Sequence, residues 1–157
     1  MCGFYGDPQK ECSCATLQVQ RYRARVSGPL LDRIDIQVEV PGVAYKELAD
    51  HTASESSADI RERVERSRKL QLQRFAGRDI YCNAQMTARD LRKHCHVAAG
   101  AERLMESAMN RLGLSARAYT RILKVARTIA DLDGAAEMGA AHVAEAIQYR
   151  SLDRTFH

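Results

Sequence analysis

Hydrophobic and polar residues alternate strictly in one segment of the chain, residues 34–40, which read Ile-Asp-Ile-Gln-Val-Glu-Val. Alternation with a period of two is typical of a β-strand that buries one face. Pro41-Gly42 follows directly and marks the end of the predicted strand. A single strand leaves its backbone groups unpaired at both edges. The pattern therefore predicts that residues 1–42 are a loop–helix–strand remnant of a larger α/β unit.

One short helix is predicted before this strand. Thr16 is a candidate N-cap, and the helix would run to about Arg25. Ser27-Gly28-Pro29 breaks it, and the turn leads into the strand.

The pattern becomes helical after a predicted linker at residues 43–55. Ser56 and Asp59 resemble a capping box, with Ser57 as an alternative cap. The helix that follows runs to about Phe75 and carries acid–base pairs at i,i+4, which stabilise an exposed helix. The predicted pairs are Asp59–Arg63, Glu62–Arg66 and Glu65–Lys69, and the thin apolar seam is Ile60, Val64 and Phe75.

Four further helices complete a predicted bundle over residues 56–157. Thr87 and Asp90 form a second capping box, Gly113 ends the next helix, Ser115 caps a longer one, and Asp133-Gly134 ends that one. Their apolar residues recur at the spacing of one buried helical face. These residues are Ala101, Leu104, Met105, Ala108, Met109 and Leu112; then Tyr119, Ile122, Leu123, Ala126, Ile129 and Ala130; and finally Val143, Ala144 and Ile147.

The composition agrees with packed helices. Hydrophobic residues make up 45% of the 157 residues and aromatics only 6%, with no Trp, so an aliphatic core is expected. The net charge of +4 permits contact with phosphate groups but is smaller than a dedicated nucleic-acid binder would carry. No apolar run is long enough to span a membrane, and residues 1–8 lack the basic and apolar regions of a signal peptide. We therefore expect a cytoplasmic protein with reduced cysteines.

Arg33 is the first candidate for chemistry, because it lies where the predicted turn meets the strand. A side chain at a strand end can project out of its domain toward another molecule. The alternative is an ordinary surface ion pair with Asp32 or Asp35, which would contribute little to stability.

Arg117 is the second candidate. If Ser115 is the N-cap, Arg117 lies in the first helical turn, where the helix dipole disfavours a cation. A guanidinium beside exposed backbone N–H groups suits a phosphate. Arg121 and Lys124 continue the same face and are possible phosphate or DNA contacts. The alternative is a solvated basic face opposite the apolar stripe.

Three of the five cysteines, Cys2, Cys12 and Cys14, share the N-terminal loop and form an incomplete candidate zinc site. A structural zinc site needs four ligands, and the sequence supplies no clear fourth. Cys82 and Cys95 are interpreted as buried apolar residues.

Motifs that would complete an active site are missing from these 157 residues. The chain contains no G-x-x-x-x-G-K-[ST], no strand that ends in paired acids for Mg²⁺, no G-x-S-x-G and no H-E-x-x-H.

Several blocks together resemble the C-terminal part of the magnesium-chelatase-like AAA+ ATPases of the ComM/YifB group. The resemblance covers nearly the whole chain in the family's order. The blocks are Gly3-Phe4-Tyr5-Gly6-Asp7-Pro8, Ser27-Gly28-Pro29-Leu30-Leu31-Asp32-Arg33-Ile34-Asp35, Glu55-Ser56-Ser57, Leu112-Gly113-Leu114-Ser115-Ala116-Arg117-Ala118-Tyr119 and Ala146-Ile147-Gln148-Tyr149-Arg150-Ser151-Leu152-Asp153.

The resemblance implies roles for both arginines. Arg33 matches the arginine finger that reaches the ATP of a neighbouring subunit, and Arg117 matches the sensor-2 arginine of the helical lid. Residues from Ser56 onward would be that lid, the C-terminal domain of the family. The family implies ATP and Mg²⁺ as cofactors, a ring of six subunits, and DNA as the partner in recombination and branch migration.

Two departures from the family pattern affect these expectations. The P-loop and Walker B segments are missing, so we expect the chain alone to be inactive and to bind no nucleotide tightly. The family's cysteine loop usually begins Cys-Pro-Cys-Gly, and Met1 stands where its first part would continue. Two alternative functions stay open: a helical module that binds nucleic acid or protein, and an ATPase subunit of magnesium chelatase.

Overall fold

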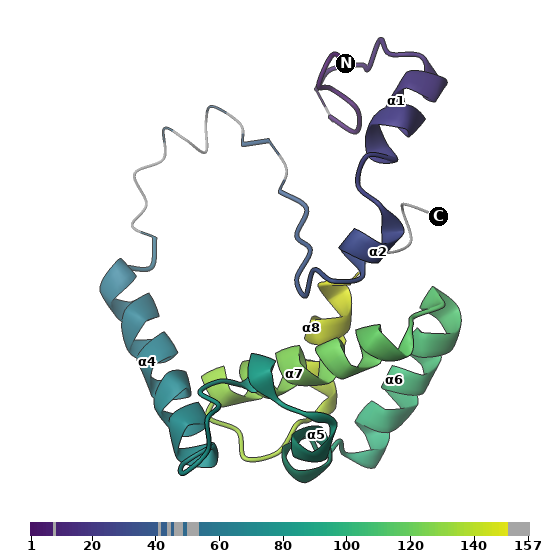
Figure 1. The fold of residues 1–157 in the computed structure, drawn as a ribbon. Helices are drawn as coiled ribbons and strands as arrows, with labels where there is room; N and C mark the ends of the chain where they lie inside the picture. Colours follow the sequence, from purple (N-terminus) through teal and green to yellow (C-terminus); the bar gives the residue numbers. More distant parts are fainter. Residues whose placement is uncertain (8, 41, 44, 46–48, 50–53, 151–157) are drawn as a thin grey trace.

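The computed structural model describes residues 1–7, 9–40, 42–43, 45, 49 and 54–150, and this part of the chain is helical and contains no β-strand. Figure 1 shows a bundle in the lower half, with the N-terminal helix above it. The elements are α1 (Thr16–Arg23), α2 (Gly28–Leu31), α4 (Ser57–Arg74), a 3₁₀ turn η1 (Asn83–Gln85), α5 (Ala88–His94), α6 (Ala99–Leu112), α7 (Ala116–Leu132) and α8 (Ala140–Gln148).

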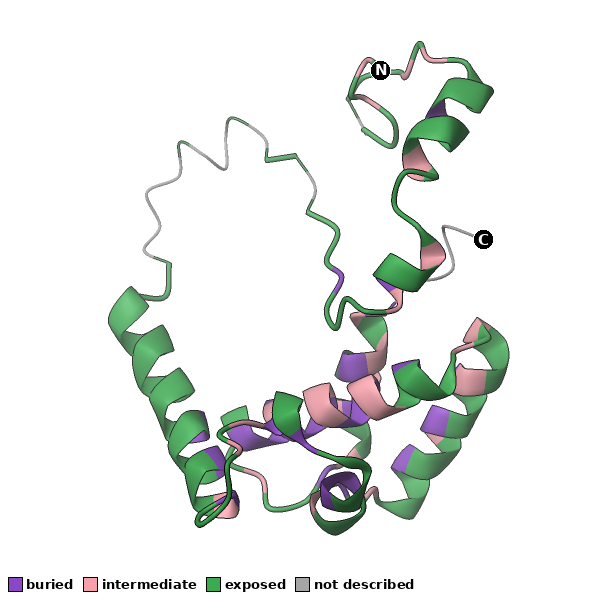
Figure 2. Cartoon of the chain, viewed as in Figure 1, coloured by how far each residue is buried: buried purple, intermediate pink, exposed green. Residues whose placement is uncertain are grey.

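Helix α7 is the centre of the bundle. It packs against α4, η1, α5 and α8, and α8 also packs against α6. In Figure 2 the buried residues concentrate on α7 and on the helix faces turned toward it. The α7 side chains that form the core are Ile122, Leu123, Ala126, Ile129 and Ala130, which confirms most of the predicted stripe. The core is therefore aliphatic, as the composition indicated.

Side-chain N-caps and one left-handed glycine determine where several helices begin and end. Ser56 Oγ accepts a hydrogen bond from the Asp59 N–H at 3.2 Å, Thr87 Oγ1 accepts one from the Asp90 N–H at 3.4 Å, and Ser115 Oγ accepts one from the Ala118 N–H at 3.1 Å. Ser56, rather than Ser57, is the cap of α4. Gly113 ends α6 at φ +60°, a left-handed conformation that residues with a Cβ adopt at a cost. Each of these boundaries was predicted.

The predicted strand at residues 34–40 is wrong. Ile36, Val38 and Val40 are 52%, 60% and 81% exposed, whereas the intervening Gln37 is only 7% exposed. The Gln37 N–H donates to the Tyr149 carbonyl at 2.8 Å, so this segment is tied to the end of α8. A strand needs a partner strand, and the described residues offer none.

The predicted break at residues 27–29 is confirmed, because α1 ends at Arg23, but the residues after it begin a helical turn and do not lead into a strand. Ser27 has an extended backbone and Pro29 lies in the first turn of α2, where its missing N–H costs nothing. Arg33 therefore lies two residues after a helical turn and not at the start of a strand.

The predicted apolar seam of α4 is confirmed at Phe75, which is 1% exposed, but it is wrong at Ile60 and Val64, which are 42% and 46% exposed. The helix packs near its C-terminal end, through Ser67, Gln71 and Phe75. The predicted Glu62–Arg66 pair forms at 4.0 Å, but Arg63 pairs with Glu55. The N-terminal half of α4 is exposed because its contacts with α7 involve only the C-terminal half.

A buried polar cluster joins α4, η1 and α7. Both carboxylate oxygens of Asp131 accept hydrogen bonds from Arg74, at 2.7 and 2.5 Å. Asn83 Nδ2 and Arg127 Nε also donate to this carboxylate, at 2.8 and 3.0 Å. Burial raises the pKa of Asp131, but the hydrogen bonds from Arg74 and Asn83 outweigh it and hold that pKa below its usual value. Asp131 therefore stays ionised inside the bundle.

Within the described residues, no helix is both long and apolar enough to cross a bilayer.

Candidate functional site

Asp32 connects the segment after α2 to the first turn of α7. Its carboxylate accepts a hydrogen bond from Ser115 Oγ at 2.9 Å and one from Arg117 Nη1 at 3.1 Å. Burial raises the pKa of Asp32, but the hydrogen bonds from Ser115 and Arg117 outweigh it and lower that pKa. An anion therefore lies at the N-terminus of α7, where the helix dipole stabilises it. This contact offsets the unfavourable position of Arg117 that the sequence indicated.

Arg150 fixes the same segment from the end of α8. Its side chain is 1% exposed and Nη2 lies 3.6 Å from Asp32 Oδ1. Nη1 donates to the Ile34 carbonyl. Sequence reasoning missed this role, because Arg150 was noticed only as part of a block shared with the family. Asp32, Ser115 and Arg150 together hold the Arg33 segment against the bundle.

Arg33 itself is exposed, and its Nη1 donates to the Pro29 carbonyl at 3.1 Å. The alternative reading, a pair with Asp32 or Asp35, does not describe this structure. Those two acids pair with Arg117 and Arg121 of α7. The Arg33 guanidinium is thus held through a backbone carbonyl and remains directed at the surface.

The remaining predicted basic residues of α7 lie in different surroundings. Arg121 pairs with Asp35, and Lys124 Nζ donates to the Ala84 carbonyl at 2.7 Å. Burial, followed by the charge of Arg121, lowers the pKa of Lys124. Lys124 therefore ties η1 to α7, whereas Arg117 and Arg121 face the Asp32–Asp35 segment.

A pocket of about 370 Å³ lies between α2 and the start of α7. Asp32, Ser115 and Arg117 line its polar side, and the side chain of Arg117 is 55% exposed. The rest of the lining is Gly28, Pro29, Leu31, Leu112, Gly113 and Leu114. A half-exposed guanidinium beside a helix N-terminus is an arrangement that a phosphate group fits.

A larger cavity, of about 690 Å³, lies between α5, α6 and α7. Its lining combines apolar side chains with both acidic and basic ones, among them Met105, Met109, Leu123, Glu102, Glu106, Arg92 and His96. Tyr119 also lines it and is 40% exposed, so the prediction that Tyr119 is buried is wrong. We place the candidate phosphate contact at the smaller pocket, because Arg117 lies there beside the N-terminus of α7.

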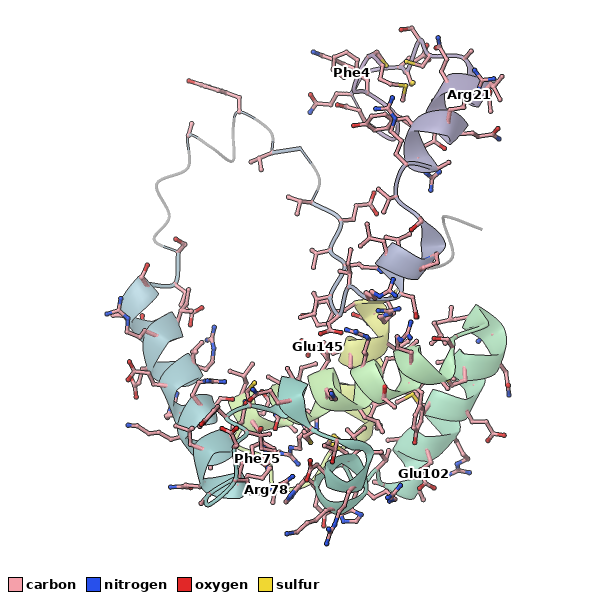
Figure 3. All side chains as sticks on the ribbon, in the orientation of Figure 1. Phe4, Arg21, Phe75, Arg78, Glu102 and Glu145 are labelled. Atoms are coloured by element: carbon pink, nitrogen blue, oxygen red, sulfur yellow. The ribbon has the colours of Figure 1, made fainter. Side chains whose placement is uncertain are left out.

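The three N-terminal cysteines lie together. The Sγ atoms of Cys2, Cys12 and Cys14 all lie within 4.8 Å of one another, and those of Cys2 and Cys12 are 3.5 Å apart. Figure 3 shows sulfur atoms gathered in the loop between the labelled Phe4 and the helix that carries Arg21. Hydrogen bonding to the Phe4 N–H, and then hydrogen bonding with Cys14 and Cys12, lowers the pKa of Cys2 to about 6.

The other two cysteines are separate from this cluster. Cys95 is 7% exposed, and burial raises its pKa to about 11, which confirms it as a buried apolar residue. Cys82 is only partly buried, so the same interpretation does not hold for it.

Comparison with known families matches both parts of the chain. Residues 54–150 match the family described as "Magnesium chelatase, subunit ChlI C-terminal". Residues 1–48 match the family described as "Magnesium chelatase, subunit ChlI".

Individual relatives agree with these matches. The chain is 42% identical to the Competence protein ComM of Haemophilus influenzae over 138 residues, which cover 87% of this chain and 26% of the relative. It is 39% identical to the uncharacterized protein YifB of Salmonella typhimurium, over 90% of this chain and 27% of the relative. The YifB protein of Escherichia coli is 37% identical, with the same coverage. The chain thus spans about a quarter of the length of these relatives.

Proposed function

Because the chain belongs to the magnesium chelatase ChlI family, we propose that it is the C-terminal part of a ring-forming AAA+ ATPase of the ComM/YifB type. In this proposal, residues 1–42 belong to the ATPase core, residues 43–55 are a linker and residues 56–157 are the helical lid. ATP and Mg²⁺ bind in the core that precedes this segment. The chain contributes Arg117 as sensor 2 and Arg33 as the finger for the neighbouring subunit.

The arrangement around Asp32 is the observation that carries this proposal. Asp32 accepts a hydrogen bond from Arg117 and directly precedes Arg33 in the chain, so one short segment links both guanidinium groups. Arg117 donates to a carboxylate at 3.1 Å, and a phosphate oxygen offers the same acceptor geometry. We propose that bound nucleotide takes the place of Asp32 as the partner of Arg117. The change would then move the segment that carries Arg33.

We propose the ComM/YifB branch of the family from the names of the similar proteins. The similar proteins described above carry the names ComM and YifB, which favours this branch over an ATPase subunit of magnesium chelatase. Action on DNA, in recombination and branch migration, is part of the same proposal.

Replacing Arg117 by alanine in the full-length ring protein tests the sensor-2 assignment. A charge-assisted hydrogen bond contributes about 1.5–3 kcal/mol, so we expect nucleotide affinity to fall roughly 10- to 100-fold. The measurement is titration with a fluorescent ATP analogue, followed by steady-state turnover. The matched control is Arg103→Ala, which removes an exposed arginine from α6. Unchanged affinity and turnover in Arg117→Ala, or an equal loss in the control, would exclude this role.

The isolated chain provides a second check. It lacks the phosphate-binding loop, so we expect no ATP turnover above background.

Nucleic-acid binding by helix α1 is a second candidate function, which one observation favours. Lys10 lies 4.8 Å from the ring centroid of Phe4. Arg23 lies 5.7 Å from the ring centroid of Tyr5, and Arg25 lies 5.7 Å from that of Tyr22. The two tyrosines are 60% and 55% exposed. Alternating cations and exposed rings suit single-stranded nucleic acid, which combines phosphates with stacking bases.

A salt-dependent titration tests this second function. We expect labelled single-stranded DNA to bind the chain at low salt and to dissociate as salt rises, because cations are released from the DNA. Joint replacement of Arg21, Arg23 and Arg25 by alanine should reduce the salt slope by about 2, at roughly 0.7 per lost phosphate contact. Arg61, Arg66 and Arg68 on the exposed part of α4 provide the control triple. No binding by the unaltered chain at low salt removes this function.

A further inference from the structure

The N-terminal loop and α1 form a small lobe with almost no hydrophobic core. Within residues 1–7 and 9–26, Val19 is the only buried side chain. Figure 2 shows this lobe as almost entirely exposed or half-buried, in contrast to the bundle. Such a small unit buries too little apolar surface to hold a loop in place, and natural proteins usually supply a disulfide or a metal ion instead. The three cysteines lie where such a link is needed.

Backbone turns in the N-terminal loop bring Cys2 close to Cys12 and Cys14. Gly3 and Gly6 have φ values of +86° and +81°, a conformation that favours glycine, and their turns return the chain toward Cys12. The Asp7 N–H donates to the Phe4 carbonyl at 3.1 Å, and Asp7 Oδ1 accepts from the backbone N–H groups of Gln9 and Lys10 at 2.8 and 3.2 Å. These turns hold Cys2 next to a Cys-x-Cys pair ten residues further along.

The sulfur positions agree with tetrahedral metal coordination. Zinc–thiolate bonds of about 2.3 Å place the sulfurs of a tetrahedron about 3.8 Å apart. The Cys2–Cys12 separation is 3.5 Å, and the whole cluster lies within 4.8 Å. A disulfide requires a separation of about 2.05 Å, so the sulfurs are spaced for a shared ion and not for a covalent bond.

The backbone provides further support for anionic sulfurs. The Cys2 N–H donates to Cys14 Sγ at 3.1 Å, and the Phe4 N–H donates to Cys2 Sγ at 3.5 Å. Hydrogen bonds to ligand atoms orient metal ligands and stabilise their charge. Soft thiolate ligands in tetrahedral geometry select Zn²⁺ over Mg²⁺ or Ca²⁺.

We propose that Cys2, Cys12 and Cys14 bind one Zn²⁺ ion as thiolates and that this ion holds the N-terminal loop on α1. Each thiol releases its proton on binding, and the three thiolates leave one position of the tetrahedral ion open to a further ligand. This binding does not depend on the proposed ATPase function.

Metal analysis of the full chain tests the proposal. The chain is purified under reducing conditions, incubated with equimolar Zn²⁺ and dialysed. Mass spectrometry of the metal should find about one zinc ion per chain. Cys14→Ser should bind zinc at least about 100-fold more weakly, because one of three ligands is lost. Cys82→Ser is the matched control and should keep its zinc. The helical signal of each variant in circular dichroism verifies that the bundle, which lies outside this lobe, is folded.

Substitution of Co²⁺ for Zn²⁺ reports the ligands directly. Three thiolates predict intense sulfur-to-cobalt charge transfer and the strong visible bands of tetrahedral Co²⁺, both lost in Cys14→Ser. The proposal is overturned by a zinc content near zero in the unaltered chain, by equal zinc loss in Cys82→Ser and Cys14→Ser, or by the weak spectrum of octahedral Co²⁺.

Discussion

In the full-length ring ATPase that we propose, replacing Arg33 by alanine is expected to reduce ATP turnover by about 10³- to 10⁵-fold, the range known for arginine fingers. A guanidinium offers several donors to the γ-phosphate and stabilises the charge of the transition state. Arg33 is exposed and is held through the Pro29 carbonyl at 3.1 Å, so its removal breaks no buried contact. Nucleotide affinity should therefore change little while the catalytic rate falls. Steady-state hydrolysis and a separate binding titration measure the two quantities.

Two further variants test whether the rate loss is specific to the guanidinium group of Arg33. Arg33→Lys keeps the positive charge but loses the planar set of donors, so most of the rate loss should persist. Arg103→Ala removes an exposed arginine from α6 and should leave the rate unchanged. Full activity in Arg33→Ala would refute the finger assignment.

A mixing experiment tests whether Arg33 acts between subunits. Subunits with Arg33→Ala retain their phosphate-binding loop, and subunits altered in that loop retain Arg33. In mixed rings, some interfaces combine an intact loop with an intact Arg33 of the neighbour, and activity should reappear. Failure to recover activity in verified mixed rings would show that Arg33 does not act across the interface.

Asp131→Ala should cause the largest loss of stability in the bundle, about 3–5 kcal/mol of unfolding free energy. The Asp131 carboxylate is 1% exposed and pairs with Arg74 and Arg127, so its removal leaves two guanidinium groups without their buried counter-ion. Urea denaturation of the chain, followed by circular dichroism, measures the change. Glu62→Ala is the control, since its pair with Arg66 is 4.0 Å long and exposed and should contribute below about 0.5 kcal/mol. Similar losses in both variants would contradict a central role for the cluster.

The same carboxylate predicts the direction of acid unfolding. The folded-state pKa of Asp131 is lowered, so its stabilising contribution is fully present above the unfolded pKa, near 3.9, and is lost as pH falls below about 4. Asp131→Asn cannot titrate and should lose less stability over this range than the unaltered chain. An equal acid sensitivity of the two proteins would assign the effect to other groups, such as Asp90, whose pKa the Arg78 hydrogen bond lowers.

Much of the helical bundle was predictable from the sequence alone. Ser56, Thr87, Gly113 and Ser115 mark helix ends through contacts within three or four residues of themselves, and such short-range chemistry is visible in the chain. The apolar stripe of α7 has the period of a helix, and it became the core. The proximity of Cys2, Cys12 and Cys14 was suggested by their shared loop.

Only the tertiary structure decided the contacts between residues far apart in the chain. Asp32 and Arg117 are 85 positions apart, and Arg74 and Asp131 are 57 apart, so no periodicity connects them. The alternating pattern of residues 34–40 predicted a strand, but a strand exists only where another strand pairs with it, and here Gln37 bonds to the end of α8 instead. Local sequence determines where a helix starts and which face is apolar, because those depend on neighbours in the chain. The ion pairs between distant residues, including the one between Arg117 and the segment that carries Arg33, depend on how the helices pack.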